Sequence, residues 1–304
     1  MSKRFFGLGS ALALCTLVAT ADAAGQQPAS AEATAGKPRI TNGRLSSQAA
    51  GASLAQTFRS LAAAQTDIAW VGYAVPIRDR ESQMCCWEGG WQRGCRLDPA
   101  SGTTQASGSA TRGPVKLEGN DTLIVLFRIV DKQVEKVRTF SEDCELDAGG
   151  RQVLWIEGVR PVESIAMLES MVGTATTGKS RIANNVIAAI SQHADPAAAP
   201  TLIRLARQHA STAVRSDALF WVAQLAGAKA VGAISEAIEN DPDTDVKKRA
   251  VFALSQLPKD EGVPLLIDVA KKNRNPAVRK QAMFWLGQTR DPRAVKFFEE
   301  ILFK

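Results

Sequence analysis

The chain has 304 residues, hydrophobic residues at 45% of its positions and a net charge of +6. This charge is mild for the length, and the basic residues are spread over both halves without a cluster of stacking aromatics. Nucleic-acid binding needs a more concentrated basic stripe, so we expect no nucleic-acid partner.

The first 23 residues have the pattern of an export signal. Lys3 and Arg4 precede an apolar run over residues 5–20, and Ala21-Asp22-Ala23 has the small residues that a signal peptidase requires. The apolar run is shorter than the roughly 20 residues of a membrane span, which favours cleavage over anchoring. Later stretches of the sequence are not apolar enough to cross a bilayer. We therefore expect a periplasmic or secreted protein without membrane insertion after cleavage.

Residues 24–45 and 46–172 differ in composition. The first segment is mostly Ala, Gln, Pro, Ser and Gly, which predicts a disordered linker. The second is predicted to be an α+β domain that opens with a helix, because Leu54, Phe58 and Leu61 recur at helical spacing. We expect about four antiparallel strands, with a hairpin at Asp131-Lys132 and flanking helices that include residues 161–172. The predicted strands are residues 67–76, 122–130, 133–140 and 153–156.

Four cysteines remain in this domain once the signal is removed: Cys85, Cys86, Cys95 and Cys144. An even number in an exported chain predicts two disulfides. A bridge between the neighbours Cys85 and Cys86 would strain their peptide, so we expect each to pair with one of the other two, with both sets open. A zinc site would need paired Cys-x-x-Cys spacings or nearby histidines. We therefore expect no metal.

Two tryptophans lie beside the cysteines, at Trp87 and Trp91. Their indole rings are expected to cover the disulfides of a domain that has little core. The alternative is contact with a ligand or partner, because Trp supplies rigid amphipathic surface.

Residues Gly173 to Ser180 match the phosphate-binding pattern G-x-x-x-x-G-K-S. This pattern binds nucleotide only when a buried strand delivers the loop and the next helix points its N-terminus at the phosphates. Residues 164–172 have helical spacing instead, and Asp268, the candidate magnesium ligand, falls inside a repeat helix. We interpret the segment as a hinge, and nucleotide binding through Lys179 as the least favoured function.

A 32-residue period organises the rest of the chain, over residues 173–304. Three segments superimpose at that spacing, with Val, Ala, Phe and Gln in register, and a weaker copy precedes them; the three begin at Val214, Val246 and Val278. Each copy has two segments with the apolar spacing of a helix face. The position before each first helix holds a capping residue type, in Ser211, Asp243 and Asn275. Four helix pairs are expected to stack into an all-α solenoid, since one pair cannot bury its apolar face alone.

The copies resemble a known family. The Asp-rich loop before Val246, the Val-Lys/Arg-x-x-Ala pattern and the turns at Asp195-Pro196, Pro258 and Asp291-Pro292 are similar to short bacterial HEAT repeats, over about residues 178–304. The segment in front resembles one that precedes HEAT repeats in exported bacterial proteins. The resemblance implies an α-solenoid that binds other proteins, and no chemistry by itself. Some HEAT-like proteins are lyases that attach pigments to proteins, so an extracytoplasmic lyase or lyase subunit is the alternative function.

The second helix of each pair is expected to carry the binding surface. Its outward polar residues change from copy to copy and are predicted to contact a protein or peptide partner: Arg204, Arg207, Glu236, Glu239 and Lys271. Four glutamines do not change, and we interpret this Gln ladder as satisfying backbone groups between repeats: Gln192, Gln224, Gln256 and Gln288. The usual nucleophile and metal chemistries lack parts in this sequence. The sequence therefore predicts a non-enzymatic scaffold or adaptor that uses no cofactor.

Overall fold

The computed structural model describes residues 36–81, 84–85, 95–98, 121–173, 181–225 and 228–303. The chain divides into Met1–Glu32, which lies outside that set, and one compact unit, Ala33–Lys304. The expected signal peptide, Cys86, Trp87, Trp91 and residues 174–180 also lie outside the described residues. Within the described ranges, no helix combines the length and the apolar character that a bilayer span requires.

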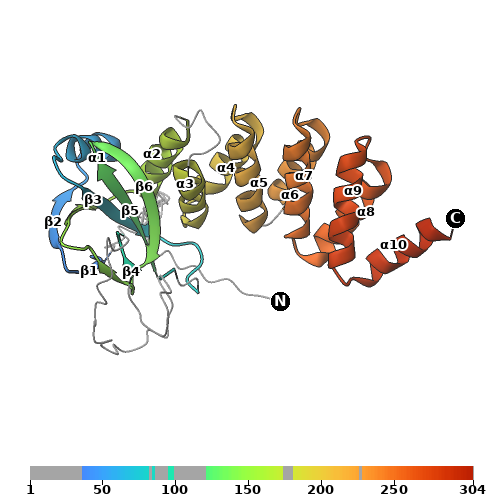
Figure 1. Cartoon of the computed structure of the whole chain (residues 1–304), viewed down its shortest axis with the longest axis horizontal. Coiled ribbons are helices and arrows are strands. Elements are labelled where there is room, and N and C mark those ends of the chain that lie inside the picture. The colour runs from blue at the N-terminus through green and yellow to red at the C-terminus, as the bar shows by residue number, and fades with distance from the viewer. Residues whose placement is uncertain are drawn as a thin grey trace, which may run out of the picture. The chain divides into compact units, whose positions relative to one another are not determined.

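A five-stranded mixed sheet forms the first half of the compact unit (Figure 1). Its order is β2 (Arg44–Ala49), β8 (Gln152–Glu157), β3 (Ala69–Pro76), β5 (Thr122–Val130) and β6 (Gln133–Ser141). β3, β5 and β6 are antiparallel neighbours, whereas β8 runs parallel to β2 and to β3. The four predicted strands are confirmed. The predicted hairpin is also confirmed, since Asp131 and Lys132 have φ of 50° and 64°, as a two-residue hairpin turn requires.

Two features of the sheet correct the sequence-based picture. The sheet has a fifth strand and parallel pairs. In addition, residues 39–41 and 44–45 of the predicted disordered linker belong to β1 (Arg39–Thr41) and β2. All residues of β2 are exposed, because this strand pairs through its backbone at the sheet edge. Composition does not reveal such a strand. The helix expected from residue 46 onward is α1 (Leu54–Ala63), which begins after the N-cap Ser53.

The two faces of the main sheet bury different clusters. Val71, Tyr73 and Val75 of β3 join the cluster that includes α1 and α2 (Pro161–Gly173). Trp70 and Ala74 point the other way, into a cluster with a small parallel sheet of β1, β7 (Glu145–Asp147) and β4 (Cys95–Arg96). Gly72 lies on that second face, where an added Cβ would come within 2.3 Å of a methyl group of Leu126. A glycine therefore lets β3 pack closely here.

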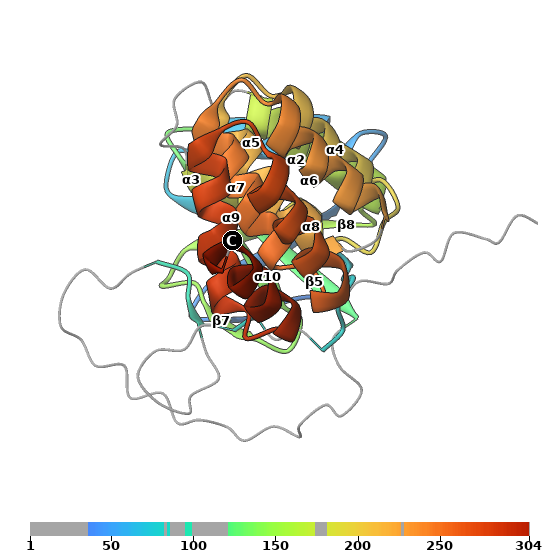
Figure 2. The same ribbon diagram turned by 90° about the vertical axis from the view of Figure 1, so that its right-hand side faces the viewer.

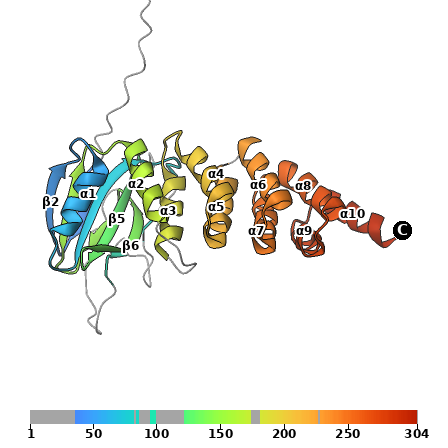
Figure 3. The ribbon, with the colours of Figure 1, turned by 90° about the horizontal axis from the view of Figure 1, so that it is seen from above.

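Eight helices in the described part of the second half form four pairs, and the predicted fold class is confirmed. The first helices are α3 (Arg181–Gln192), α5 (Thr212–Leu225), α7 (Thr244–Ser255) and α9 (Pro276–Gln288). The second helices are α4 (Ala198–Gln208), α6 (Ala228–Asn240), α8 (Lys259–Lys272) and α10 (Pro292–Leu302). The pairs follow one another in a row (Figure 3), and Figure 2 shows first and second helices in separate layers.

The basic residue of the Val-Lys/Arg pattern holds the end of the preceding helix. In three copies it donates to a carbonyl oxygen there: Arg215 Nη1 to His209 (2.8 Å), Lys247 Nζ to Glu239 (2.6 Å) and Arg279 Nη1 to Asn273 (2.8 Å). The last carbonyls of a helix lack intrahelical donors and favour a nearby cation. The predicted caps Asp243 and Asn275 are confirmed, because their side chains accept from Val246 N and Ala277 N.

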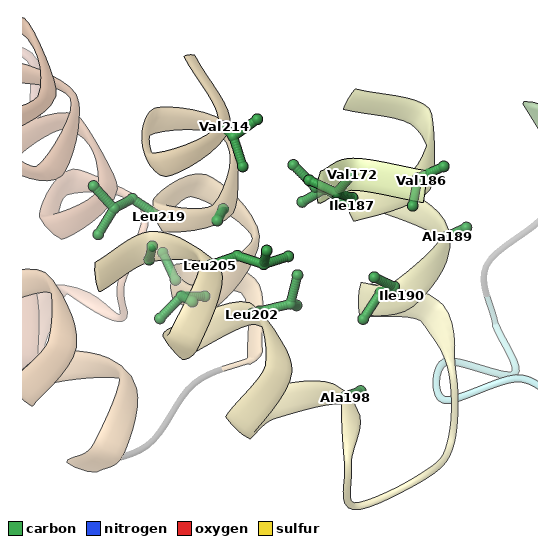
Figure 4. Packing of buried hydrophobic residues seen from close by; sticks show 14 of the residues in the cluster. Val172, Val186, Ile187, Ala189, Ile190, Ala198, Leu202, Leu205, Val214 and Leu219 are labelled. Atoms are coloured by element: carbon green, nitrogen blue, oxygen red, sulfur yellow. The ribbon is translucent and has the colours of Figure 1, made fainter. Parts of the chain in front are cut away.

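One apolar core continues from the sheet into the repeats. Leu202 and Leu205 of α4 point toward α3 in Figure 4, and both belong to the cluster that contains the β3 side chains. The end of β3 also bonds to the end of α3, because Arg78 N donates to the Gln192 carbonyl (2.8 Å) and Ile77 bridges His193. The first repeat is thus joined to the sheet. The domain boundary at residue 173 stays a prediction, and this core continues across it.

Candidate functional site

The charged second-helix residues predicted to bind a partner form contacts with neighbouring parts of their own layer, which α2 begins (Figure 2). Arg204 Nη2 contacts Glu169 of α2 at 2.6 and 2.7 Å. Arg207 pairs with Glu236 at 2.5 Å, and Lys271 with Glu300 at 3.2 Å. The copy-to-copy changes of charge are therefore complementary across two of the repeat junctions.

The remaining junction would place like charges at equivalent positions, in Glu239 and Asp268. These two carboxylates bind other residues instead: Asn273 Nδ2 donates to Glu239 (3.0 Å), and Lys272 pairs with Asp268 (2.5 Å). All five predicted residues of this layer are thus engaged within the chain. Their contact with a partner protein stays a prediction.

Within the described ranges, no side-chain hydrogen bond of the Gln ladder joins two repeats, in contrast to the predicted inter-repeat contacts. Gln224, Gln256 and Gln288 are exposed, and within the described ranges Gln256 Nε2 donates only to the neighbouring Ser255 (3.1 Å). Gln192 Oε1 is buried without a partner there. The physical reason is position: the last three amides lie on the outward side of their helices. They are available to a partner.

An aromatic stripe runs across the first helices, and it consists of Phe220, Trp221, Phe252, Phe284 and Trp285. The rings of Phe220 and Phe252 stack at 6.0 Å with planes 4° apart, and Trp285 lies 4.9 Å from Phe252. Trp221 and Phe284 extend the stripe at 5.1 and 5.0 Å from their neighbouring rings. Phe284 is 53% exposed. A group of neighbouring aromatic side chains that reaches the surface in this way is typical of a contact surface.

Polar groups flank the aromatic stripe. Each Phe stands four residues before a glutamine of the ladder, which places ring and amide one turn apart on the same helix face. A hollow of about 380 Å³ opens at the C-terminal end of the stripe, and its lining includes Trp285, Gln256, Gln288 and Lys259. Arg249 lies over the ring of Phe252 at 5.3 Å. Aromatic rings, exposed amides and cations thus lie close together along the first helices.

The residue patterns predict a binding surface on the second helices and do not single out the aromatic stripe. A signal was present, since Phe recurs every 32 residues in the printed sequence. A constant aromatic position is equally consistent with a buried core residue. Only the structure separates the buried Val222 and Leu219 from the partly exposed Phe220 and the exposed Phe284.

The cysteines form a disulfide between loops of the sheet domain. Cys85 and Cys144 are bridged with Cα atoms 5.5 Å apart, which agrees with the expectation for Cys85 and selects one of the two open pairings. Cys95 is also disulfide-bonded, and its partner lies outside the described residues. Asp143 stands close enough to Cys85 and Cys144 for a metal cluster, but the two sulfurs are bonded to each other. They are therefore not available as thiolate ligands.

The phosphate-binding pattern follows a helix. Gly173 ends α2, and residues 174–180 lie outside the described residues. Asp268 lies within α8, in the predicted repeat helix. The strand that would deliver a nucleotide-binding loop is thus replaced by α2, as the helical spacing predicted.

A buried chain of hydrogen bonds joins the sheet, α2 and the end of α3. Tyr73 OH lies 2.7 Å from Ser164 Oγ, which lies 2.8 Å from His193 Nε2, and His193 Nδ1 lies 2.7 Å from the Ala189 carbonyl. Because the carbonyl only accepts, Nδ1 carries the proton, Nε2 accepts from Ser164, and Ser164 accepts from Tyr73. Burial lowers the pKa of His193 to about 4 and raises the pKa of Tyr73.

This Ser-His pair has the geometry of an activated nucleophile, but it is enclosed. Ser164 and Tyr73 have no exposed surface, and His193 has 1%. A substrate cannot reach a serine in that position without opening the core. We interpret the chain Tyr73–Ser164–His193 as a structural connection between the sheet and the first repeat.

Together, stacked helix pairs with a constant register define an α-helical repeat protein, a class that presents extended binding surfaces. Residues 231–303, from α6 to the end of α10, match the family model for HEAT repeats. These helices are HEAT repeats, and the 32-residue register extends the pattern back through α5 to α3.

Comparison with curated proteins finds no match. Among solved structures, one similar chain belongs to the complex of CpcE and CpcF of phycocyanin lyase from Nostoc sp. PCC7120. The two chains are 16% identical, and the alignment covers 47% of this chain and 91% of that one, with a TM-score of 0.37.

Proposed function

We propose that this protein is an exported, non-enzymatic interaction scaffold whose HEAT repeats bind a polypeptide partner on the aromatic stripe. The observation that carries the proposal is the half-exposed ring of Phe284 at the end of stacked aromatic side chains, beside glutamine amides that are free of intrachain contacts between repeats. Aromatic side chains dominate the energy of protein interfaces, because they bury large rigid area at little entropic cost. The second helices offer charges that already have partners within the chain.

Charge defines the partner further. Arg249 and Lys280 are exposed on α7 and α9 and form no ion pair within 4.0 Å among the described residues, although the charge of Asp217 on α5 acts on Arg249 at longer range. A partner segment with an apolar side chain and acidic neighbours would complement this surface. The exposed amides of Gln256 and Gln288 would pair with the backbone of an extended segment, since an amide can both donate and accept, and the Gln256 amide bonds only to the neighbouring Ser255 among the described residues.

Export is the second part of the proposal. It is supported by the signal pattern of residues 1–23 and by the Cys85–Cys144 bridge, because disulfides persist mainly in oxidising compartments. We expect the mature protein in the periplasm or outside the cell, and its intact mass after purification from the native envelope to begin at Ala24. A full-length mass in the cytoplasmic fraction would contradict export.

The binding surface is tested by crosslinking in native cells, followed by mass spectrometry of the captured proteins. Phe284→Ala is expected to lower capture of the partner at least tenfold. Val162→Ala on α2 is the matched control, since that apolar side chain is 50% exposed on the other layer, and it should leave capture unchanged. Unchanged capture by Phe284→Ala, with loss in Arg207→Glu, would move the binding surface to the second helices.

A further inference from the structure

A larger hollow lies at the junction between the sheet and the first two repeats. Its volume is about 680 Å³, within the range of pockets that bind small molecules. Ile203 of α4 and Val222 and Leu225 of α5 contribute its apolar wall, together with several alanines. Most small-molecule sites combine such a wall with a few polar groups.

Two cations complete the lining, and neither has an acidic partner among the described residues. The backbone N of Arg78 donates to the Gln192 carbonyl at 2.8 Å, and its Nη1 donates to the Gln224 carbonyl at 3.3 Å. This bond fixes the guanidinium at the lining of the hollow, and its other N–H groups have no hydrogen-bond partner among the described residues. Lys229, near the start of α6, supplies the second cation.

The only described carboxylate in the lining belongs to Asp195, which already accepts from Ala197 N at 2.8 Å. His193 also belongs to the lining, although only 1% of its surface is exposed, and it is neutral near pH 7 because burial lowers its pKa to about 4. The described lining therefore carries a net charge of +1, from Arg78, Lys229 and Asp195.

We propose that this hollow binds a small molecule with an apolar body and one carboxylate. The alkyl side chains would take up the body, and the planar guanidinium of Arg78 can give two parallel N–H groups to a carboxylate. Lys229 adds attraction as a point charge. A nucleotide fits poorly, since two cations in a mainly apolar hollow would leave most phosphate oxygens without donors. This site is separate from the aromatic stripe and does not depend on the proposed scaffold function.

The test is calorimetric titration of the mature full chain with decanoate, and with decanol as the uncharged analogue. We expect one decanoate per chain and at least tenfold weaker binding of decanol. Arg78→Gln and Lys229→Gln should each weaken decanoate binding at least fivefold. Arg290→Gln, an exposed cation in the turn between α9 and α10, is the control and should leave affinity unchanged.

Four outcomes would overturn the proposal. Equal binding of decanoate and decanol would show that the carboxylate makes no favourable contact. Unchanged affinity in Arg78→Gln would show that Arg78 does not bind the carboxylate. Several decanoates per chain would indicate adsorption to exposed apolar surface. Displacement of decanoate by a short apolar peptide would assign the hollow to a polypeptide C-terminus instead.

Two further variants separate this site from the rest of the chain. Ala199→Leu extends an alkyl group from the lining, so it should abolish decanoate binding while the melting temperature stays close to that of the unmodified chain. Phe284→Ala should bind decanoate normally.

Discussion

Arg207 of α4 and Glu236 of α6 form an ion pair at 2.5 Å that joins two successive repeats, although each differs from its equivalents in the other copies. Both side chains are more than 40% exposed, so solvent screens the pair. We expect Arg207→Glu to lower the free energy of unfolding by about 0.2–1 kcal/mol, and Glu236→Arg in the same chain to restore most of it. Urea unfolding of the double-mutant cycle measures this coupling. Additive effects of the two changes would show that the pair contributes nothing.

A second pair, Arg215 and Asp241, is enclosed. Arg215 donates to both carboxylate oxygens at 2.8 and 3.1 Å, and the two side chains are 9% and 5% exposed. Asp241→Asn leaves the guanidinium without its counter-charge, so we expect a loss of about 3–5 kcal/mol in urea unfolding. Asp245→Asn is the control, because the Asp245 side chain is 85% exposed, and its loss should stay below about 1 kcal/mol. Equal losses of unfolding free energy in the two variants would show that burial does not make the Arg215–Asp241 pair more important for stability.

Stability is expected to fall below neutral pH through His193. Its pKa is lowered from 6.5 to about 4 in the folded chain, mainly by burial, so the unfolded chain binds a proton in this range that the folded chain does not. The free energy of unfolding therefore decreases as pH falls from about 6.5 toward 4, by on the order of 3 kcal/mol in total.

The measurement is urea unfolding at several pH values between 4 and 7, compared with His193→Gln. The variant cannot accept this proton, so its pH dependence over that window should be shallower by the amount assigned to His193. Parallel pH profiles for the two chains would show that another group titrates.

The Cys85–Cys144 bridge closes a loop of 59 residues. The chain-entropy relation assigns about 4 kcal/mol to a loop of that length, as an upper estimate. We expect the Cys85→Ser, Cys144→Ser double variant to unfold at lower urea concentration under non-reducing conditions. The double variant is preferable to a reductant, because Cys95 is also disulfide-bonded. An unchanged midpoint would show that the bridge does not constrain the unfolded chain.

The helices were predictable because the same apolar and capping positions recur in successive copies of the repeat. Each apolar position of α5 has counterparts in α7 and α9, and Asp243 and Asn275 mark two of the helix starts. β2 was not predictable, since its exposed side chains give no apolar signal and its order depends on pairing with β8 more than 100 residues later. The parallel pairing of β3 with β8 is long-range in the same way.

Features of the candidate sites were predictable only in part. The recurrence of Phe220, Phe252 and Phe284 is visible in the sequence, but their exposure depends on how neighbouring repeats pack. Arg78 precedes the repeats by about a hundred residues, and only the fold brings it to the Gln224 carbonyl. The charge pairs between second helices likewise depend on the stagger of one helix pair against the next.

At the junction with β3 and β6, the sheet covers the side of α3 that has no preceding repeat. α3 rests on β6, where Asn185 donates to the Val137 carbonyl at 2.9 Å, and it is bonded to the end of β3 through His193 and Arg78. Helical repeats are stabilised mainly by their neighbours, and end units open most easily. The sheet therefore stabilises the first repeat against local unfolding. Amide protection against hydrogen exchange should decline in a gradient from α3 toward α10.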